Sequence, residues 1–238
     1  VQTQLEEAAA ITEEAETAAA PVETPEAEMV VANAEEGGTG NAAPATPDAP
    51  KTIDDFEEIS EWPAKAPDVY RVKFGSTAGP YVIEVQKKWA PIGAEHFYEL
   101  CKVGYFNDAG YFRVIENFMV QFGLAADPKL SAQYRSKRLQ DEPVRKSNQR
   151  GMVTFAKSGQ PNSRTTQLFI NYVDNSRLDQ DGFAPFGEVI FGMENVDNIN
   201  SEYGAQSNNQ AAIEQRGSAF LKENFPNLDY VTKVTLVK

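Results

Sequence analysis

The stretch FRVIENFMVQFG, residues 112–123, places one arginine and one glutamine among large apolar side chains. Arg113 and Gln121 lie on either side of Phe118 and Met119. A strand that only fills a core has no use for a guanidinium, and an outer strand has little use for so many apolar groups. A guanidinium donates several hydrogen bonds, whereas rings and a thioether contact apolar groups. This combination favours recognition of an extended apolar peptide.

Nucleophilic and metal-dependent sites lack the residues they need. His96 is the only histidine and Cys101 the only cysteine. A Ser–His–Asp or Cys–His site would have to use His96, no serine lies in a G-x-S-x-G turn, and one histidine with one cysteine cannot form a zinc cluster. No Gly-rich phosphate loop is present. We therefore expect no metal and no cofactor, a structural His96, and a buried Cys101 that behaves as a small hydrophobe.

A basic loop, YRSKR to VRKSNQR in residues 134–150, is the only feature that suggests nucleic acid. Asp141 and Glu142 interrupt it, and residues 67–238 carry 20 basic and 19 acidic residues, a net charge of +1. Nucleic-acid-binding domains usually carry a strongly basic surface. The segment is interpreted as a solvated loop, and no nucleic-acid partner is expected.

The elements that position these residues are mostly strands. Residues 68–74 alternate with period two, and 81–86 return as the hairpin partner after a Gly/Pro turn. A helix is predicted from Pro91 to Gly104, with Ala94, Phe97, Leu100 and Cys101 on one face. Further strands are predicted at 111–115, 118–123, 151–156, 167–172, 186–191 and 230–237, with helices near 193–200 and 211–223. Many short strands with few helices indicate a mostly antiparallel sheet or a closed barrel.

The N-terminal segment differs sharply in composition. Residues 1–66 hold 16 acidic and two basic residues, a net charge of −14, and no aromatic residue precedes Lys51. Such a segment buries too little apolar surface to offset the entropy of ordering it. Residues 1–66 are therefore interpreted as an acidic low-complexity tether, disordered over 1–50, with a short helix near 53–61. An acidic interaction tail is the alternative.

Location is predicted only from composition. No window of 18 apolar residues is present, so no membrane span is expected. The sequence begins at Val1, so we expect that an initiator or targeting segment has been removed. A long acidic Ala/Pro/Thr tether suits an exported or envelope-tethered protein, so an extracytoplasmic location is favoured.

Three sequence blocks carry a family resemblance. FRVIENFMVQFG, FAKSGQPNSRTTQLFINY (155–172) and NSRLDQDGFAPFGEV (175–189), in this order and spacing, resemble the cyclophilin family of peptidyl-prolyl cis–trans isomerases over roughly 68–238. GFAPFGEV and ENFPNLDYV resemble a bacterial or algal exported subgroup. The resemblance implies a closed eight-stranded antiparallel β-barrel capped by two α-helices, with the active site in an outer groove of the domain 67–238.

The same resemblance assigns site residues. Arg113 corresponds to the family's catalytic arginine. The resemblance implies substrate-binding roles for the proline-pocket walls Phe118, Met119, Phe169 and Leu178, the rim residue Phe183, the polar groups Gln121 and Gln167, and the groove residue Ala156. Two alternatives stay open: Arg113 could pair with Glu116 at the surface, and Gln167 could be a structural hydrogen-bonding residue.

Isomerisation fits this residue set on physical grounds. Twisting an X–Pro bond breaks amide resonance, a barrier of ~18–20 kcal/mol. No proton has to move, so a catalyst only has to bind the twisted amide better than either planar form. Arg113 can donate hydrogen bonds to the amide while an apolar pocket holds the proline ring, and Gln121 can orient Arg113.

Three positions depart from the family pattern. Arg177 stands where many members have tryptophan, Phe183 where many have histidine, and Lys157 where asparagine is usual. Loss of the tryptophan removes part of the family's cyclosporin site, whereas Phe183 can still close the proline pocket.

The predicted function is peptidyl-prolyl isomerisation of proline-containing polypeptides by a monomer that assists folding. The alternative is a module that binds proline-containing segments in the same groove without turnover. A third hypothesis assigns the function to the acidic tail and treats the barrel as a scaffold.

Overall fold

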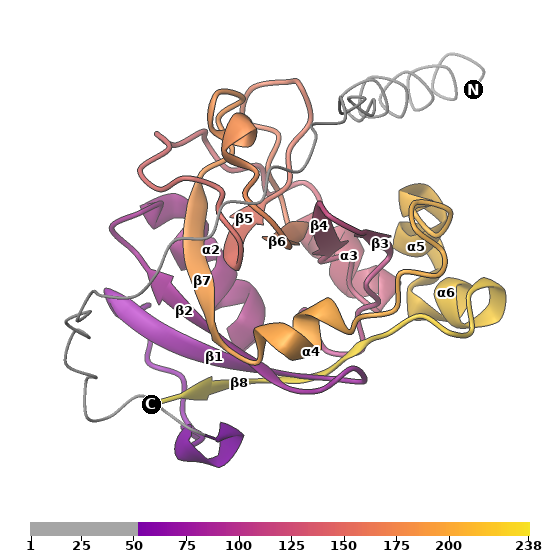
Figure 1. Cartoon of the computed structure of the whole chain (residues 1–238), viewed down its shortest axis with the longest axis horizontal. Coiled ribbons are helices and arrows are strands. Elements are labelled where there is room, and N and C mark those ends of the chain that lie inside the picture. Colours follow the sequence, from indigo (N-terminus) through magenta and orange to yellow (C-terminus); the bar gives the residue numbers. More distant parts are fainter. Residues whose placement is uncertain (1–51) are drawn as a thin grey trace, which may run out of the picture. The chain divides into compact units, whose positions relative to one another are not determined.

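The computed structural model describes residues 52–238, and these form one compact unit with an eight-stranded sheet (Figure 1). Strand β1 (Val69–Ser76) pairs antiparallel with β2 (Tyr81–Gln86), with Val72 opposite Ile83. Tyr70, Val72 and Phe74 are buried while the residues between them are partly exposed, as period-two alternation requires. The predicted hairpin is confirmed.

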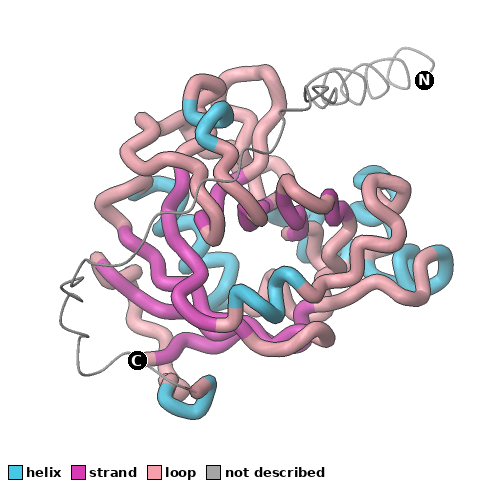
Figure 2. Tube along the Cα trace, in the orientation of Figure 1, coloured by secondary structure: helices cyan, strands magenta, loops and turns pink. Residues whose placement is uncertain are grey.

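The other predicted strands are confirmed to within two residues. They are β3 (Arg113–Ile115), β4 (Met119–Phe122), β5 (Met152–Phe155), β6 (Leu168–Asn171), β7 (Pro185–Phe191) and β8 (Val231–Val237). All neighbours pair antiparallel, in the order β3-β4-β6-β5-β7-β2-β1-β8. Long loops make most of the connections among β4, β5, β6 and β7 (Figure 2).

The expectation of a closed barrel is wrong. Strands β3 and β8 are the two ends of the sheet and are not paired as strands. The chain segments just before them meet instead, through an isolated bridge between Gly110 and Tyr230 and a bond from the amide of Tyr111 to the carbonyl of Asp229 at 3.1 Å. Asp108 has a φ of +59°, which interrupts extended backbone beside this contact. The described sheet is therefore a half-barrel.

Five α-helices, rather than two, accompany the sheet in the described residues. Helix α2 (Pro91–Lys102) confirms the predicted helix, with proline at its first turn and Gly104 at a φ of +71° beyond its end. Three further helices are α3 (Pro128–Tyr134), which was not predicted, α4 (Met193–Asp197), shorter than the predicted 193–200, and α5 (Gln210–Arg216).

The single helix predicted at 211–223 is two helices, α5 and α6 (Ser218–Asn224), separated by Gly217. Gly217 has a φ of +64°, and a Cβ there would lie 1.8 Å from the carbonyl oxygen of Ala126. Only glycine tolerates both conditions, so the helix breaks at this residue.

The core lies between the sheet and α2. Phe74 stacks on Tyr81 at 5.3 Å between ring centroids, and Phe97 packs on Phe186 at 4.9 Å. Cys101 is 2 % exposed within this core, and burial raises the pKa of its thiol. The prediction of a buried cysteine is confirmed.

Glu142 corrects the interpretation of the basic loop as fully solvated. Its carboxylate is buried and accepts hydrogen bonds from the amides of Ile92 and Gly93, at 2.6 and 2.9 Å. Arg164, itself 1 % exposed, donates to the same carboxylate at 2.9 Å. Helix α2 has no acidic residue in its first turn, so a loop about fifty residues away caps its positive end.

Residues 52–66 pack on the sheet next to β8. Phe56 is 3 % exposed, and the amide of Ile59 donates to the carbonyl of Leu236 at 2.8 Å. The helix predicted near 53–61 is only a 3₁₀ turn, η1 (Ile53–Asp55), where the amide of Thr52 donates to Asp55 Oδ2. The predicted disordered tether, 1–50, lies outside the described residues.

Among residues 52–238, no helix has the length and apolar content needed to cross a membrane.

Candidate functional site

Arg113 is the first residue of a short hairpin formed by β3 and β4. Asn117 adopts a φ of +58°, which asparagine tolerates well, and the amide of Phe118 donates to the carbonyl of Ile115 at 3.1 Å. The hairpin register places Arg113 directly opposite Gln121.

Side chains along the neighbouring strands β3, β4 and β6 point alternately into the core and to the opposite, outer face, which carries the candidate site. Val120, Leu168 and Ile170 belong to the main core. The residues between them face the other side of the sheet because successive side chains alternate. The register pairs Gln121 with Phe169, so these two lie side by side with Arg113 on that outer face, and Met119 is on it as well.

The Arg113 guanidinium is half-buried, and burial lowers its pKa below the usual range of arginine. It has no carboxylate within ion-pair distance among the described residues. Glu116, the alternative partner, instead accepts a hydrogen bond from Ser201 at 2.7 Å. The guanidinium therefore keeps most of its donors available to a ligand.

Two glutamines extend from the arginine across the sheet. Arg113 Nη1 donates to Gln121 Oε1 at 3.3 Å, and Gln121 Nε2 donates to Gln167 Oε1 at 2.8 Å. Gln121 is 7 % exposed and Gln167 is partly exposed. The bond that an orienting role for Gln121 requires is present, and Gln167 is joined to the same network.

An apolar wall lies next to these glutamines. The rings of Phe169 and Phe183 meet edge to face at 5.7 Å between centroids. The amide of Phe183 donates to the carbonyl of Leu178, which lies in the 3₁₀ helix η2 (Ser176–Asp179), and the amide of Ala156 donates to the carbonyl of Gln167. The structure thus brings the predicted residues of β6, η2 and the following loop together.

Phe118 lies beside Met119 at the start of β4 and is half-buried. Its carbonyl accepts hydrogen bonds from the amide of Tyr172 at 2.9 Å and from Asn175 Nδ2 at 2.8 Å. These two bonds fix the backbone from which the Phe118 ring extends.

Two cations contact the aromatic residues of the site. The Arg177 guanidinium lies 5.0 Å from the centroid of the Phe118 ring, and Lys157 Nζ lies 5.4 Å from that of Phe183. Neither cation is within ion-pair distance of a carboxylate in the described part of the chain. Both occupy ring surfaces, as cation–π contacts do. The residues that depart from the family pattern therefore touch the predicted pocket.

Sequence reasoning missed a supporting residue in the basic loop. Asn148 is fully buried; its side chain donates to Asp179 Oδ1 and to the carbonyl of Phe183, both at 2.8 Å, and accepts from Thr154 at 2.9 Å. It ties the loop carrying Leu178 and Phe183 to strand β5. An asparagine between basic residues gives no periodic signal, so no pattern pointed to it.

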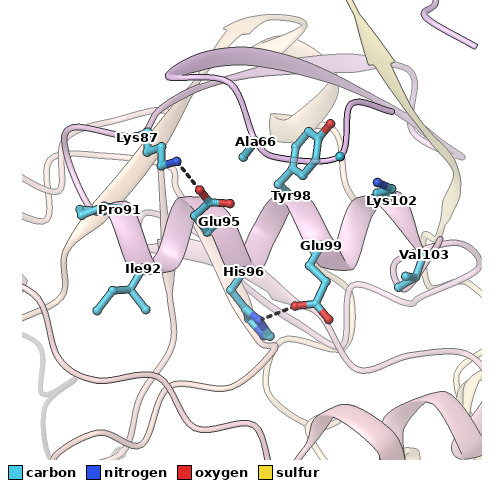
Figure 3. Close-up of a pocket in the computed structure, with 11 residues that line it drawn as sticks. Ala66, Lys87, Pro91, Ile92, Glu95, His96, Tyr98, Glu99, Lys102 and Val103 are labelled. Carbon is cyan, nitrogen blue, oxygen red and sulfur yellow. Dashed lines mark hydrogen bonds and ion pairs between the residues drawn. The ribbon is translucent and has the colours of Figure 1, made fainter. Parts of the chain in front are cut away.

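Two surface hollows of the described residues lie away from the predicted site residues. One of about 830 Å³ is formed by the exposed side of α2 and includes His96, Glu95 and Lys87 (Figure 3). Another of about 450 Å³ includes Arg150 and Asp197. Neither is lined by a predicted site residue. The predicted site residues lie instead on the face of Arg113, where guanidinium donors without an ion pair in the described chain lie near an apolar wall.

His96 is 7 % exposed and packs against the ring of Phe155 at 5.9 Å between centroids. Burial lowers its pKa below the usual 6.5. It lies on α2, whereas Arg113 lies on β3. Both observations agree with the structural role predicted for it.

Known proteins match the part of the chain that contains the predicted site residues. A family model described as "Cyclophilin type peptidyl-prolyl cis-trans isomerase/CLD" matches residues 70–217. A peptidyl-prolyl cis-trans isomerase of Acinetobacter baylyi is 34 % identical over 146 residues, which cover 58 % of this chain and 77 % of that protein. Peptidyl-prolyl cis-trans isomerase B of Escherichia coli is 32 % identical over 136 residues, covering 54 % and 82 %.

Solved structures give the same fold. A Cryptosporidium parvum cyclophilin-type peptidyl-prolyl cis-trans isomerase, crystallised in the presence of the dipeptide Ala-Pro, matches with a TM-score of 0.53 at 20 % identity. The match covers 70 % of this chain and 98 % of that one. At this identity the likeness concerns the fold alone.

Proposed function

The chain belongs to the cyclophilin-type peptidyl-prolyl cis-trans isomerase family, and from this membership we infer that it catalyses rotation about X–Pro bonds, with Arg113 as the catalytic residue. The observation that carries the inference is the outer face on which Arg113, Gln121 and Phe169 meet from three adjacent antiparallel strands. Its substrates are proline-containing polypeptides, and the enzyme acts as a monomer that assists folding.

Arg113 acts by stabilising the twisted amide. When the X–Pro bond rotates, resonance is lost, the proline nitrogen regains its lone pair, and the carbonyl changes direction. A guanidinium with free donors hydrogen-bonds to these groups best when the amide is twisted, which lowers the barrier. Partial burial of Arg113 strengthens this interaction because little water competes with it.

The apolar wall holds the proline ring while the other side of the amide turns. Phe169, packed edge to face on Phe183, supports this role, and Met119 lies on the same face of the sheet. We assign Phe118 and Leu178 to the same pocket, and Ala156 to the groove beside it. The cations on Phe118 and Phe183 then line the rim of the pocket.

Gln121 and Gln167 complete the polar side of the site. Gln121 holds Arg113 through the 3.3 Å bond, and Gln167 lies where a substrate backbone would run past Ala156. Because each side-chain amide keeps one unused N–H donor and one unused acceptor lone pair, both can also contact the peptide.

We assign the function to residues 67–238 and treat residues 1–66 as the acidic segment of an extracytoplasmic family member, a tether whose last part, residues 52–66, packs on the sheet. The composition of the tether and the GFAPFGEV and ENFPNLDYV segments support this assignment. Fractionation of cells that express the chain, followed by blotting, tests it; recovery only with cytoplasmic proteins would contradict it.

One assay separates isomerisation from mere binding. The wild-type chain is added to a short proline peptide, and cis–trans exchange and peptide binding are both measured by NMR. We expect faster exchange at catalytic amounts of protein. Binding of the peptide without faster exchange would select the non-catalytic binding module instead.

A further inference from the structure

Strand β3, which carries Arg113, is held on its outer edge by a segment distant in the sequence. This flanking segment, residues 204–227, contains α5 and α6, which lie beside β3 in Figure 1. The amide of Val114 donates to the carbonyl of Gly204 at 3.1 Å, and the buried hydroxyl of Ser207 donates to the carbonyl of Phe112 at 2.8 Å. The flanking segment thus takes the place next to β3 that a closed barrel would give to another strand.

A separate apolar cluster anchors the same segment. Phe112 is fully buried, not in the main core but with Ile213 of α5 and Leu221 of α6. Burial of a phenylalanine side chain is strongly favourable. Because Phe112 immediately precedes Arg113, this packing restricts the backbone from which the guanidinium extends.

The flanking segment also reaches the guanidinium through side-chain amides. Gln167 Nε2 donates to Gln210 Oε1 at 2.7 Å, and Gln210 Nε2 donates to Asn208 Oδ1 at 3.1 Å. With the two bonds already described, Arg113 is joined to Gln210 through Gln121 and Gln167. In each glutamine the oxygen accepts from one neighbour and the nitrogen donates to the next, so the orientation of one amide favours that of the others.

We propose that Gln210 is a positioning residue for Arg113, acting through Gln167 and Gln121, and that the flanking segment holds Gln210 in place. Gln210, the first residue of α5, accepts the hydrogen bond from Gln167 Nε2. Without that acceptor the Gln167 amide loses its fixed orientation, and Gln121 then holds the guanidinium less tightly. The inference rests on the proposed function, because it concerns the same site.

The test compares replacements of Gln210 that keep or remove the acceptor. Gln210→Met has nearly the same size but is a poor acceptor, whereas Gln210→Glu still accepts from Gln167. We expect Gln210→Met to lower kcat about three- to tenfold with KM unchanged, as expected for loss of one hydrogen bond felt in the transition state. Gln210→Glu is expected to recover most of kcat.

Gln215 provides a matched control, since it lies exposed on the same helix. Gln215→Met should leave kcat and the unfolding midpoint at wild-type values. Where Gln210→Met lowers the unfolding midpoint, Gln210→Ala removes the same acceptor without a bulky side chain, and the same loss of kcat is expected of it.

A double-mutant cycle separates positioning of Arg113 from a general structural effect. In an Arg113→Ala background, Gln210→Met should have no further effect on kcat, because the guanidinium that it positions is gone. An unchanged kcat in Gln210→Met, no recovery by Gln210→Glu, or an equal loss in the Arg113→Ala background would overturn the inference. Failure of the wild-type chain to accelerate exchange would instead overturn the proposed function.

Discussion

Arg113 keeps a half-buried charge without a carboxylate partner in the described chain. Such a position costs free energy unless a ligand or a hydrogen bond compensates for it. Gln121 supplies one acceptor, at 3.3 Å, and the remaining donors are available to a substrate amide. At the scale of single residues, the site thus consists of the Arg113 guanidinium, whose remaining donors are free for a ligand, and the Gln121 side-chain amide, which orients it.

His96 gives a prediction about pH and stability. Burial is the largest effect and lowers the pKa of His96; nearby Lys137 and Arg164 lower it further, whereas Glu99 and a backbone bond with Thr165 raise it. Because the pKa of the folded protein lies below that of the unfolded chain, the unfolded chain binds the proton more readily. The stabilisation is complete above about pH 6.5 and is lost as pH falls through the folded pKa.

We therefore expect His96→Gln to lose less stability than the wild type when pH falls from about 7.5 to about 5. Urea unfolding at several pH values measures it. Parallel pH dependences for the two proteins would show that His96 is not the group responsible.

At the scale of elements, the buried Glu142 connects helix α2 to the loop before β5. Removing one partner of a buried ion pair leaves the other charge uncompensated. Glu142→Ala should lower the free energy of unfolding by about 3 kcal/mol, because Arg164 and two helix amides lose their acceptor. Glu95 lies on the same helix and forms an exposed ion pair with Lys87, which precedes the helix; Glu95→Ala should cost less than about 1 kcal/mol. Equal losses in denaturant unfolding would contradict the capping role.

The pattern of short apolar stretches separated by turn residues predicted every strand of the described sheet, and in β1 it alternates with period two because one face is buried and the other is partly exposed. It could not predict that the sheet stays open, since pairing of β3 with β8 depends on the backbone at Asp108 and Gly110. Nor could it predict the break at Gly217, because the clash with Ala126 joins residues about ninety apart.

The candidate site also contains residues that the sequence could predict and residues that it could not. Arg113 and the apolar residues near it could be predicted because they lie close together in one stretch of sequence. Gln210 and Asn148 could not, because each acts through a partner that only the fold brings near: Gln167 for one and Asp179 for the other.

At the scale of the whole molecule, residues 52–66 are part of the packed unit although their composition is acidic. Phe56 is buried with Val82 and Val237, and Lys238 forms a backbone bond with Glu57. This strip therefore stabilises the sheet next to β8, whatever the role of the residues before it.

Two truncations test this division. A chain that begins at residue 52 should keep the isomerase activity and unfolding midpoint of the full chain. A chain that begins at residue 67 loses the buried Phe56 and should unfold at a midpoint lower by about 5 °C or more. Equal midpoints would show that the strip adds no stability, and loss of activity or partner binding in the first truncation would favour a functional tail.

The central claim is that Arg113 stabilises the twisted X–Pro amide, and exchange of a proline peptide in Arg113 variants tests it most directly. Arg113→Ala is predicted to lower kcat/KM by about 10²-fold or more with an unchanged unfolding midpoint, and Arg113→Lys to recover only part of it, because lysine lacks the planar fork of donors. Arg71→Ala, which removes a surface arginine paired with Glu84 on β1 and β2, should behave as wild type. Wild-type turnover in a folded Arg113→Ala variant would contradict the account.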